Sequence, residues 1–392
     1  MNYALTGAAA LMMTAAPVLA GGIERAPQSL TSLFEPADNY VELSFGGVDP
    51  TVEGTDTLGF RTGDVAQGYG FVGLAYKRQF TPEISGAIII EQPFGADVFY
   101  QPQPNPAAPN PGVDGSFLLG GTRAQVDSTT FTALARYKMP NNFSVHGGIR
   151  GSRADGNVTL DGAAYGPVAG YSVDLDSDTA VGWVAGVAWE RPDIAARVSL
   201  TYNSAIDHNF DTTESGPLVD PDGPGPAPAL PLLAGTSTTE VSTPKSWNLE
   251  FQTGVAADTL VFGSIRWVNW SEFQVNPERF VTVTGEGLVE LDDTTTYTLG
   301  VGRKFTENWS GSALVTFEKK GDNLVSPLAP TNGRKGITLA GVYTQGPMKI
   351  TTGVNYTKLG DAQPETGTPD TARASMTDSD AWGLGVRVGY SF

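Results

Sequence analysis

Apolar and polar residues alternate with a period of two along most of the chain after about residue 38. In the last segment one parity carries Trp382, Leu384, Val386, Val388, Tyr390 and Phe392, while the other carries glycines, Arg387 and Ser391. Aromatic residues therefore stand at both ends of an apolar face of roughly ten residues. This arrangement is typical of a β-strand that crosses a lipid bilayer between two belts of interfacial aromatic residues.

The same alternation predicts about fourteen strands. They lie near 39–48, 68–80, 83–93, 122–138, 143–154, 178–190, 195–208, 239–256, 258–270, 290–305, 308–320, 334–345, 347–358 and 380–392. Short connections follow every second strand, at 81–82, 140–142, 191–193, 257, 306–308 and 345–346. The other connections are longer and include the proline-rich runs 101–112 and 217–231. Short turns on one side and long loops on the other predict an all-β fold, a 14-stranded antiparallel transmembrane β-barrel.

A barrel in lipid has to close, because an unpaired strand edge leaves backbone N–H and C=O groups without partners. We therefore expect the last strand to pair with the first, near residues 40–47. The proline-rich runs could otherwise be linkers between domains, but the pieces that flank them hold only a few alternating strands each. A single barrel over 38–392 is the better interpretation.

The start of the chain has the features of a secretory signal peptide. A short apolar core over 4–16 precedes Pro17 and the small-residue site Val18-Leu19-Ala20, although no Lys or Arg comes before the core. This stretch is too short for a membrane anchor, and we expect export with cleavage after Ala20. Residues 21–37 then remain at the periplasmic mouth as a tail or a plug. Their apolar residues favour a plug, and these are Ile23, Leu30, Leu33 and Phe34. We therefore interpret 21–37 as an N-terminal hatch.

Composition excludes several classes of protein. After the first twenty positions no apolar run reaches the roughly 18 residues of a membrane helix. The chain has no cysteine, which excludes disulfides and thiolate sites. With 42 acidic and 24 basic residues the net charge is −18, so we expect no nucleic-acid partner. We place much of the excess acid in solvated loops between strands: Asp155, Asp161, Asp174, Asp176, Asp178 and Asp211.

The beginning of the mature chain resembles a known family. The stretches Gly21–Leu30, Leu33-Phe34-Glu35, Asn39–Gly46 and Val48-Asp49-Pro50 look like the start of FadL/TodX-type outer-membrane transporters of long-chain fatty acids and hydrocarbons, in their alphaproteobacterial branch. The run Gln125–Thr130 and the closing Gly389-Tyr390-Ser391-Phe392 are similar too.

This resemblance implies a barrel whose lumen is plugged by the hatch, with an apolar pocket that receives ligand from an extracellular site. It also implies sideways release through an opening at a kink in the third strand, where Gly86 and Pro93 are the candidates for the kink and Pro93 also suits a plain strand end. The hatch is shorter than in the enteric members and shows no Asn-Pro-Ala motif, so the mode of gating is left open.

A pocket for an acyl chain needs an apolar lining and one or two cations for a carboxylate. By parity, the inward-facing cations are Arg136, Arg150, Arg197, Arg266 and Arg387. Pairing with inward acids such as Glu190, Glu250 and Glu318 is their alternative role. We predict inward apolar residues at Val72, Leu74, Ile89, Leu134 and Leu314. The ligand contacts we predict are Ile23, Leu30, Leu33, Phe34, Arg136, Arg150 and Arg266.

Other chemistry is weakly indicated. A lipase or deacylase needs a serine and a histidine on one face, and Ser144 with His146 offers only the i, i+2 spacing of any strand, while His208 lies at a loop. The run 174–178 has acids at alternate positions but lacks the glycine and distal glutamate of a Ca²⁺ loop, and bridging to lipopolysaccharide suits it equally. We expect no enzyme activity, metal or cofactor.

The sequence thus predicts a monomeric outer-membrane transporter for passive uptake of long-chain fatty acids or other hydrophobic compounds. Its expected partners are the ligand, outer-membrane lipids, lipopolysaccharide and, during biogenesis, the barrel assembly machinery. A general diffusion porin and a structural or adhesive barrel are the alternatives.

Overall fold

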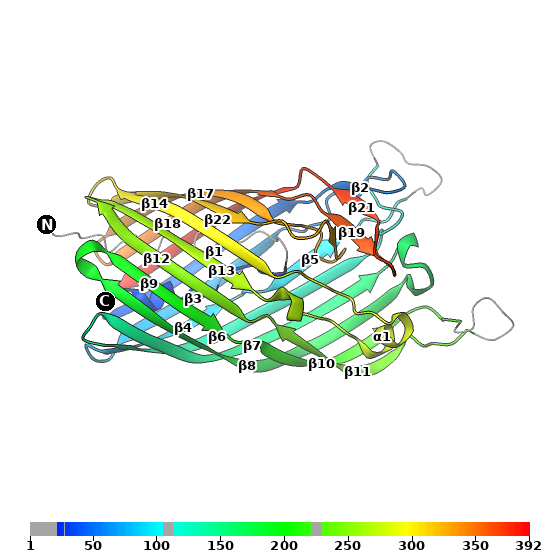
Figure 1. The fold of residues 1–392 in the computed structure, drawn as a ribbon, viewed down its shortest axis with the longest axis horizontal. Helices are drawn as coiled ribbons and strands as arrows, with labels where there is room; N and C mark the ends of the chain where they lie inside the picture. Colours follow the sequence, from blue (N-terminus) through cyan, green and yellow to red (C-terminus); the bar gives the residue numbers. More distant parts are fainter. Residues whose placement is uncertain (1–21, 27, 105–112, 221–228) are drawn as a thin grey trace.

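The computed structural model describes residues 22–26, 28–104, 113–220 and 229–392 as a long closed β-barrel (Figure 1). The predicted signal peptide, residues 1–20, falls outside the described residues. Among the described residues no helix is long and apolar enough to cross a membrane.

Seventeen strand pieces form the wall, as one continuous sheet. They are β1 (Asn39–Thr51), β3 (Tyr69–Gln79), β4 (Ile84–Glu91), β5 (Gly95–Phe99), β6 (Arg123–Lys138), β7 (Phe143–Leu160), β8 (Tyr171–Arg191), β9 (Ala196–Asn203), β10 (Ile206–Ser215), β11 (Gly235–Thr243), β12 (Ser246–Ala256), β13 (Thr259–Val268), β14 (Thr294–Lys304), β15 (Trp309–Glu318), β17 (Arg334–Gln345), β18 (Met348–Leu359) and β22 (Asp380–Ser391). Three strands are interrupted, as the pairs β4/β5, β9/β10 and β11/β12, so the wall has the fourteen antiparallel strands that the sequence predicts.

The barrel closes between its last strand and its first, as predicted. Strand β22 pairs with β1 over twelve consecutive positions, from Tyr40 opposite Ser391 to Thr51 opposite Asp380. The backbone N–H of Asn39 also donates to the carbonyl oxygen of Phe392 at 3.1 Å. The C-terminus therefore lies at the same end of the barrel as the short turns (Figure 1).

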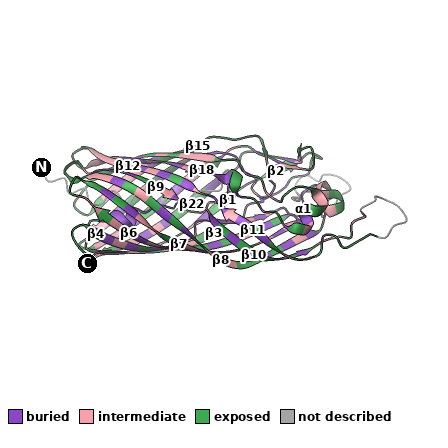
Figure 2. Ribbon diagram, turned by 60° about the horizontal axis from the view of Figure 1, so that its bottom comes forward, coloured by how far each residue is buried: buried purple, intermediate pink, exposed green. Residues whose placement is uncertain are grey.

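The two faces of the wall follow the period of two, and alternating bands of buried and exposed residues run around the barrel (Figure 2). In β22 the predicted outward residues Trp382, Leu384 and Tyr390 are exposed, while Arg387 is buried. Aromatic residues also contact each other across neighbouring strands, as exposed Trp183 does with half-buried Tyr202. Such outward aromatic belts mark the membrane–water boundaries of an outer-membrane barrel.

The predicted parity is confirmed for Ile89, Leu134 and Leu314, which are buried on the inner face. It is wrong for Val72 and Leu74, whose side chains are 58% and 43% exposed on the outer face. Both parities of β3 carry bulky apolar or aromatic residues, so alternation alone does not identify its inner face. The buried residues Ala75 and Lys77 show that the opposite parity faces the lumen.

The wall rises further at the loop end than the sequence pattern suggested. Strand β7 continues to Leu160, β8 begins at Tyr171 and β10 continues to Ser215. Five of the acids assigned to loops therefore lie in strands: Asp155 in β7, Asp174, Asp176 and Asp178 in β8, and Asp211 in β10. The sixth, Asp161, lies in the loop after β7.

The long loops fold over the open end of the barrel and carry short elements. These are β2 (Gly54–Asp56), α1 (Glu278–Thr284), β16 (Leu324–Val325), β19 (Gln363–Thr366), β20 (Thr371–Ala372), β21 (Ala374–Met376) and the 3₁₀ turns η3 (Ala163–Val168) and η5 (Trp270–Glu272). Strand β2 pairs with β21, and the Tyr100 hydroxyl donates to the carbonyl oxygen of Pro327 at 3.0 Å. Distant loops are thus joined into one cap with its own buried apolar cluster.

Candidate functional site

Residues 22–26 and 28–37, which we call the N-terminal segment, contact the inner face of several strands. The Nδ2 group of Asn248 donates to the carbonyl oxygen of Gln28 at 2.9 Å, and the hydroxyl of Ser29 donates to Glu250 at 2.6 Å. Both wall residues belong to β12. The segment therefore lies in the lumen, with its polar groups held by inward side chains of the wall.

Ion pairs fasten the two ends of this segment. Near its start, both carboxylate oxygens of Glu24 accept hydrogen bonds from Arg266. The bond from Nε of Arg266 to Oε2 of Glu24 measures 3.2 Å. Near its end, Glu35 lies 3.5 Å from the ammonium of Lys349. All four side chains are nearly buried. Charges desolvated in this way stay paired, because a buried charge without a partner is costly.

The apolar residues of the segment pack against the wall. Leu30, Leu33 and Phe34 are buried together in one cluster with inward residues of β3, β4, β6 and β8. Leu33 has no exposed surface. The chain forms a short 3₁₀ turn here, η2 (Thr31–Phe34), which presents its side chains to the surrounding strands. Ile23 lies elsewhere, in a second apolar cluster.

Phe34 is enclosed by cations. The guanidinium carbons of Arg136 and Arg197 lie 4.5 and 4.6 Å from the centre of its ring, and the His146 ring meets it edge-on. Cation–π contacts of this kind are favourable, and more so when the cation is desolvated. Arg136 and Arg197, on the inner face of the wall, thus contact the N-terminal segment.

Three arginines were predicted to contact ligand, and all three are engaged within the protein. Arg136 pairs with Glu190, Arg266 pairs with Glu24, and Arg150 lies 3.6 Å from Glu91 and donates to the Thr132 hydroxyl at 3.1 Å. Arg387 pairs with Glu42 in the same way. Among the described residues, none of these arginines lines the apolar cavity of the upper lumen.

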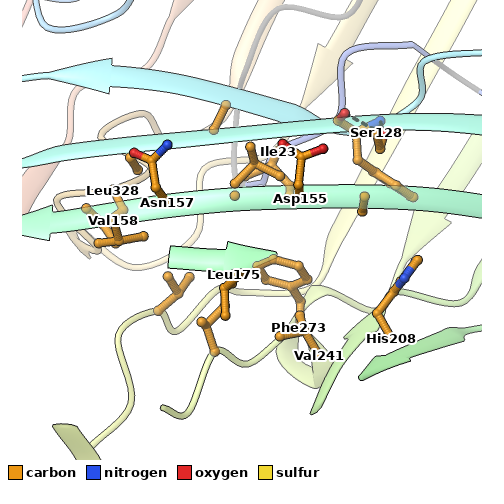
Figure 3. A pocket seen from close by; sticks show the side chains of 18 of the residues that line it. Ile23, Ser128, Asp155, Asn157, Val158, Leu175, His208, Val241, Phe273 and Leu328 are labelled. Carbon is orange, nitrogen blue, oxygen red and sulfur yellow. Dashed lines mark hydrogen bonds between the residues drawn. The ribbon is translucent and has the colours of Figure 1, made fainter. Parts of the chain in front are cut away.

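This cavity, which we call the upper cavity, has an almost entirely apolar lining. Its walls come from four sources: Ile23 of the N-terminal segment, the barrel strands, the loop between β13 and β14, and the loop between β15 and β17. Figure 3 shows the side chains of Ile23, Leu175 and Phe273 around the same space. Its apolar lining is that of a site for a small hydrophobic ligand.

Polar side chains at the upper cavity are mostly satisfied by the protein. Ser128 accepts from the backbone N–H of Phe94 and donates to its carbonyl oxygen, at 3.0 and 2.6 Å. His208 is 1% exposed, and its Nδ1 lies 2.9 Å from Asp178. The Nε2 atom of His208 has no hydrogen-bond partner among the described residues.

The sequence placed His208 at a loop, and the structure corrects this. The residue lies in β10, in a run of inward positions with Phe210, Thr212 and Glu214. Only Ile206 and Phe210 are apolar among the inward positions of β10, so the apolar alternation is too sparse to mark the whole run as a strand. The strand is recognised in the structure because every second residue of β10 is buried.

A second cavity lies where the third strand is interrupted. Residues of both faces line it, including Glu42 and Arg387 from the lumen and Val72 from the outer surface. Strand β4 ends at Glu91 and β5 begins at Gly95. The break is therefore at Pro93, because proline cannot donate to a strand ladder, whereas Gly86 lies within the regular pairing of β4.

The backbone groups around this break are satisfied by other means. The ladder between β3 and β4 stops at Leu74 opposite Ile90. Beyond it, the N–H of Val72 donates to the Gln92 side chain at 3.1 Å. On the luminal side, the N–H of Arg25 donates to the carbonyl oxygen of Pro93 at 2.8 Å. The N-terminal segment thus lies across the interruption in the wall, which we call the wall break.

The residues considered for other chemistry are not arranged for it. Ser144 accepts a hydrogen bond from Arg136 at 3.0 Å, while the Nε2 of His146 lies 3.0 Å from the Thr201 hydroxyl. Asp174 and Asp176 are exposed, and Asp178 is engaged with His208. Within the described part of the chain, no three His, Cys, Asp or Glu side chains are grouped as a metal would need.

Comparison with known proteins gives one family. The family model described as outer membrane protein transport protein (OMPP1/FadL/TodX) matches residues 26–392. A search of curated protein sequences gives no match.

Solved structures share the fold at low sequence identity. A Pseudomonas aeruginosa FadL homologue superimposes with a TM-score of 0.69 and 14% identity, over 95% of this chain and 96% of that one. The Pseudomonas putida toluene transporter TodX gives 0.63 and 14%, over 92% of each chain. The Ralstonia pickettii toluene transporter TbuX gives 0.60 and 11%, over 97% of this chain and 96% of that one.

Proposed function

Since the chain belongs to the OMPP1/FadL/TodX family, and is therefore a bacterial outer-membrane transporter of hydrophobic compounds, we propose that it takes up such compounds passively through the upper cavity. Long-chain fatty acids and aromatic hydrocarbons are the substrate classes we consider. Two of the similar structures are described as toluene transporters.

The observation that carries this proposal is the lining of the upper cavity. Its walls are almost entirely apolar, and they combine wall residues with two loops and Ile23 of the N-terminal segment. Movement of the loops would admit a ligand from outside, and movement of the segment would release it inward. Transport by binding and release needs no reacting groups, which fits a family of transport proteins.

For the exit we propose sideways release through the wall break. The cavity there is lined from both faces of the wall, and the N-terminal segment covers its luminal side. Ile23 lines the upper cavity while Arg25 lines the cavity at the break. Two residues of one short segment therefore line the two cavities. Displacement of residues 23–26 would connect the upper cavity with the cavity at the wall break.

A general diffusion porin is the alternative, and a structural or adhesive barrel is the second. A porin needs a water-filled channel, whereas here the N-terminal segment occupies the lumen and is fastened at both ends. We further propose that the chain acts as a monomer, contacts lipopolysaccharide through its acidic outer strands, and is inserted by the barrel assembly machinery.

The test is to fill the upper cavity. In Ala124→Phe a ring is added at a buried cavity position of β6, and Thr129→Phe, at an exposed position of the same strand, is the control. We expect the first variant to bind the hydrophobic fluorophore 1-N-phenylnaphthylamine at least about tenfold more weakly than the wild type, because overpacking excludes the ligand. The control should bind normally.

Liposome swelling tests the alternative on the same protein. We expect little permeation of arabinose through the wild-type chain. Rapid arabinose entry would favour a porin, and equal fluorophore binding by both phenylalanine variants would reject the upper cavity as the binding site.

A further inference from the structure

Among the described residues that line the upper cavity, one buried side-chain nitrogen, Nε2 of His208, is left without a hydrogen-bond partner. His208 is 1% exposed and lines the cavity, at one side of the group of apolar side chains in Figure 3. Its Nε2 has no hydrogen-bond partner among the described residues. Buried polar atoms are rarely left in this state, and one that borders a ligand cavity is a candidate contact for ligand.

The ring of His208 is held in place from two sides. Its face stacks on Phe210, with ring centres 5.3 Å apart and an interplanar angle of 15°. Its Nδ1 lies 2.9 Å from Oδ2 of Asp178, and that oxygen also accepts the backbone N–H of Asn209 at 3.3 Å. A fixed ring gives Nε2 a fixed direction, which is what a specific contact requires.

An irregularity in the wall brings Asp178 to the histidine. Ala154 of β7 lies opposite Asp178 of β8, but Gly156 lies opposite Leu175. Strand β8 therefore has one residue more than β7 between these two pairs, which is a β-bulge. The bulge turns Asp178 toward His208 while Asp174 and Asp176 remain exposed. Bulges often redirect a side chain next to a functional site.

The carboxylate determines what Nε2 offers to a ligand. A carboxylate only accepts, so Nδ1 of His208 carries the proton and donates it to Asp178. In the neutral ring the other nitrogen, Nε2, then has a free lone pair and is an acceptor. A ligand O–H group can donate a hydrogen bond to this nitrogen.

Charge at the cavity agrees with an uncharged ligand. Among the described residues that line the upper cavity there is no Lys or Arg, and Asp155 is its one acidic residue. A carboxylate ligand would find no cation there, whereas the wall arginines below it are paired with acids. This differs from the cation-assisted fatty-acid site that the sequence suggested.

We propose that Nε2 of His208 accepts a hydrogen bond from the hydroxyl group of an otherwise apolar ligand, and that the upper cavity prefers phenols and alkanols to hydrocarbons of the same shape. Asp178 is the positioning residue, because it fixes the tautomer without reaching the ligand. This rests on the proposed function of the upper cavity and names the substrate class for it.

The test uses ligands of one shape with the purified full-length chain. The compounds p-cresol, p-xylene and p-methylanisole share a para-substituted ring, and only p-cresol can donate a hydrogen bond. Each competes with bound 1-N-phenylnaphthylamine, for the wild type and for His208→Phe. The ratio of p-cresol to p-xylene affinity is compared between the two proteins, which cancels partition into detergent.

We expect this ratio to be about two- to tenfold larger in the wild type, the gain of one hydrogen bond. In His208→Phe the p-xylene affinity should persist, which shows that the cavity is still formed. In the wild type p-methylanisole should bind like p-xylene. In Asp178→Asn the ring loses its charged acceptor, so the p-cresol to p-xylene ratio should fall toward that of His208→Phe.

Two outcomes would overturn the inference and leave the proposed function standing. One is an unchanged p-cresol to p-xylene ratio in His208→Phe while both compounds still bind. The other is tightest binding of the anion p-toluate that disappears with His208, which would mean a charged imidazolium. Failure of every compound to displace the fluorophore would instead overturn the proposed function together with the inference.

Discussion

The guanidinium of Arg25 lies against the Cα of Gly95 and reaches the carboxylate of Asp127 at 2.9 Å. A Cβ on Gly95 would lie 2.4 Å from the guanidinium carbon, so only glycine leaves room for it. The same group lies 4.8 Å from the centre of the Tyr69 ring on β3. One side chain of the N-terminal segment thus joins β3 and β6 on either side of the wall break.

Replacing Arg25 by alanine should free the wall break. The variant loses an ion pair and a cation–π contact, together about 1–2 kcal/mol at a partly exposed site. We expect a fluorophore bound in proteoliposomes to leave for acceptor vesicles roughly tenfold faster, measured by stopped flow. Gly95→Ala should act in the same direction by displacing the guanidinium.

Arg61→Ala is the matched control for this prediction. Its ion pair with Asp114 measures 3.2 Å and lies in exposed loops. Release rates of the Arg25 variant that equal those of this control would show that the arginine does not restrain the exit.

Replacing Glu24 by glutamine should loosen the N-terminal segment. Arg266 would keep its contacts with Ser246 and Asn248, at 3.1 and 2.5 Å, but lose the carboxylate. A charge-assisted hydrogen bond contributes about 2 kcal/mol. Amides of residues 28–35 should then exchange with deuterium about thirtyfold faster by mass spectrometry, since exchange follows the local opening equilibrium.

The control is Glu83→Gln, at an exposed periplasmic turn. If both variants exchanged at the wild-type rate, the pair of Glu24 and Arg266 would not be what holds the segment in the lumen.

Replacing Glu214 by alanine should release the helix α1, whose flanking loop residues line the upper cavity. The carboxylate of Glu214 accepts the N–H groups of Arg279 and Phe280 at 3.0 and 2.9 Å, and the Tyr171 hydroxyl at 2.8 Å. Arg279 and Phe280 are the second and third residues of α1. The N-cap residue of this helix is Pro277, which offers no side-chain acceptor. Glu214 therefore caps the helix from the wall.

Loss of an N-cap costs about 1–2 kcal/mol, and the loop of α1 contributes Phe273, Val275 and Val289 to the cavity. We expect faster proteolysis between residues 270 and 293 and weaker fluorophore binding. Glu240→Ala, at an exposed position on neighbouring β11, should change neither. Normal binding with an intact loop would contradict the role of Glu214.

The cap should loosen as the pH rises through neutrality. Burial raises the pKa of Glu365 to about 7, and the nearby carboxylates of Asp370, Glu286 and Glu290 add to the effect. A raised pKa means that the folded loops bind the proton more tightly than the unfolded chain. This contribution to stability is complete below about pH 4.5 and is lost as the pH rises through about 7.

Deuterium exchange in residues 363–372 and 286–290 checks this prediction. It should be faster at pH 8 than at pH 5 after correction for the intrinsic rate, and Glu365→Gln should remove the difference. A pH dependence that persists in that variant would assign the effect to another group.

The period of two was enough to predict the wall, because a membrane strand exposes one apolar face to lipid and hides the other. It predicted the fourteen strands and the inward side of the wall arginines, and the cost of an unpaired edge in lipid predicted the closure of β22 on β1. It was ambiguous at β3, where Val72 and Leu74 share the strand with bulky residues of the other parity.

The candidate site was less accessible to the same reasoning. Burial of His208 and Glu214 depends on a strand whose inward face mixes the apolar Ile206 and Phe210 with polar residues, so its apolar signal is weak. The partner of His208 depends on a bulge in β8, and the place of Arg25 depends on the missing Cβ of Gly95. Such features are set by contacts between distant segments, which alternation along one strand does not encode.

The length of β8 has a consequence for where ligand is first met. The exposed residue Trp183 belongs to the aromatic belt, and the cavity residue Leu175 lies eight positions further along the same strand. At about 3.3 Å per residue and a tilt of roughly 40°, that is about 20 Å of height above the lipid surface. The upper cavity thus stands well above the band of the wall that faces lipid, and on the proposed uptake route a hydrophobic molecule would bind there before it meets the bilayer.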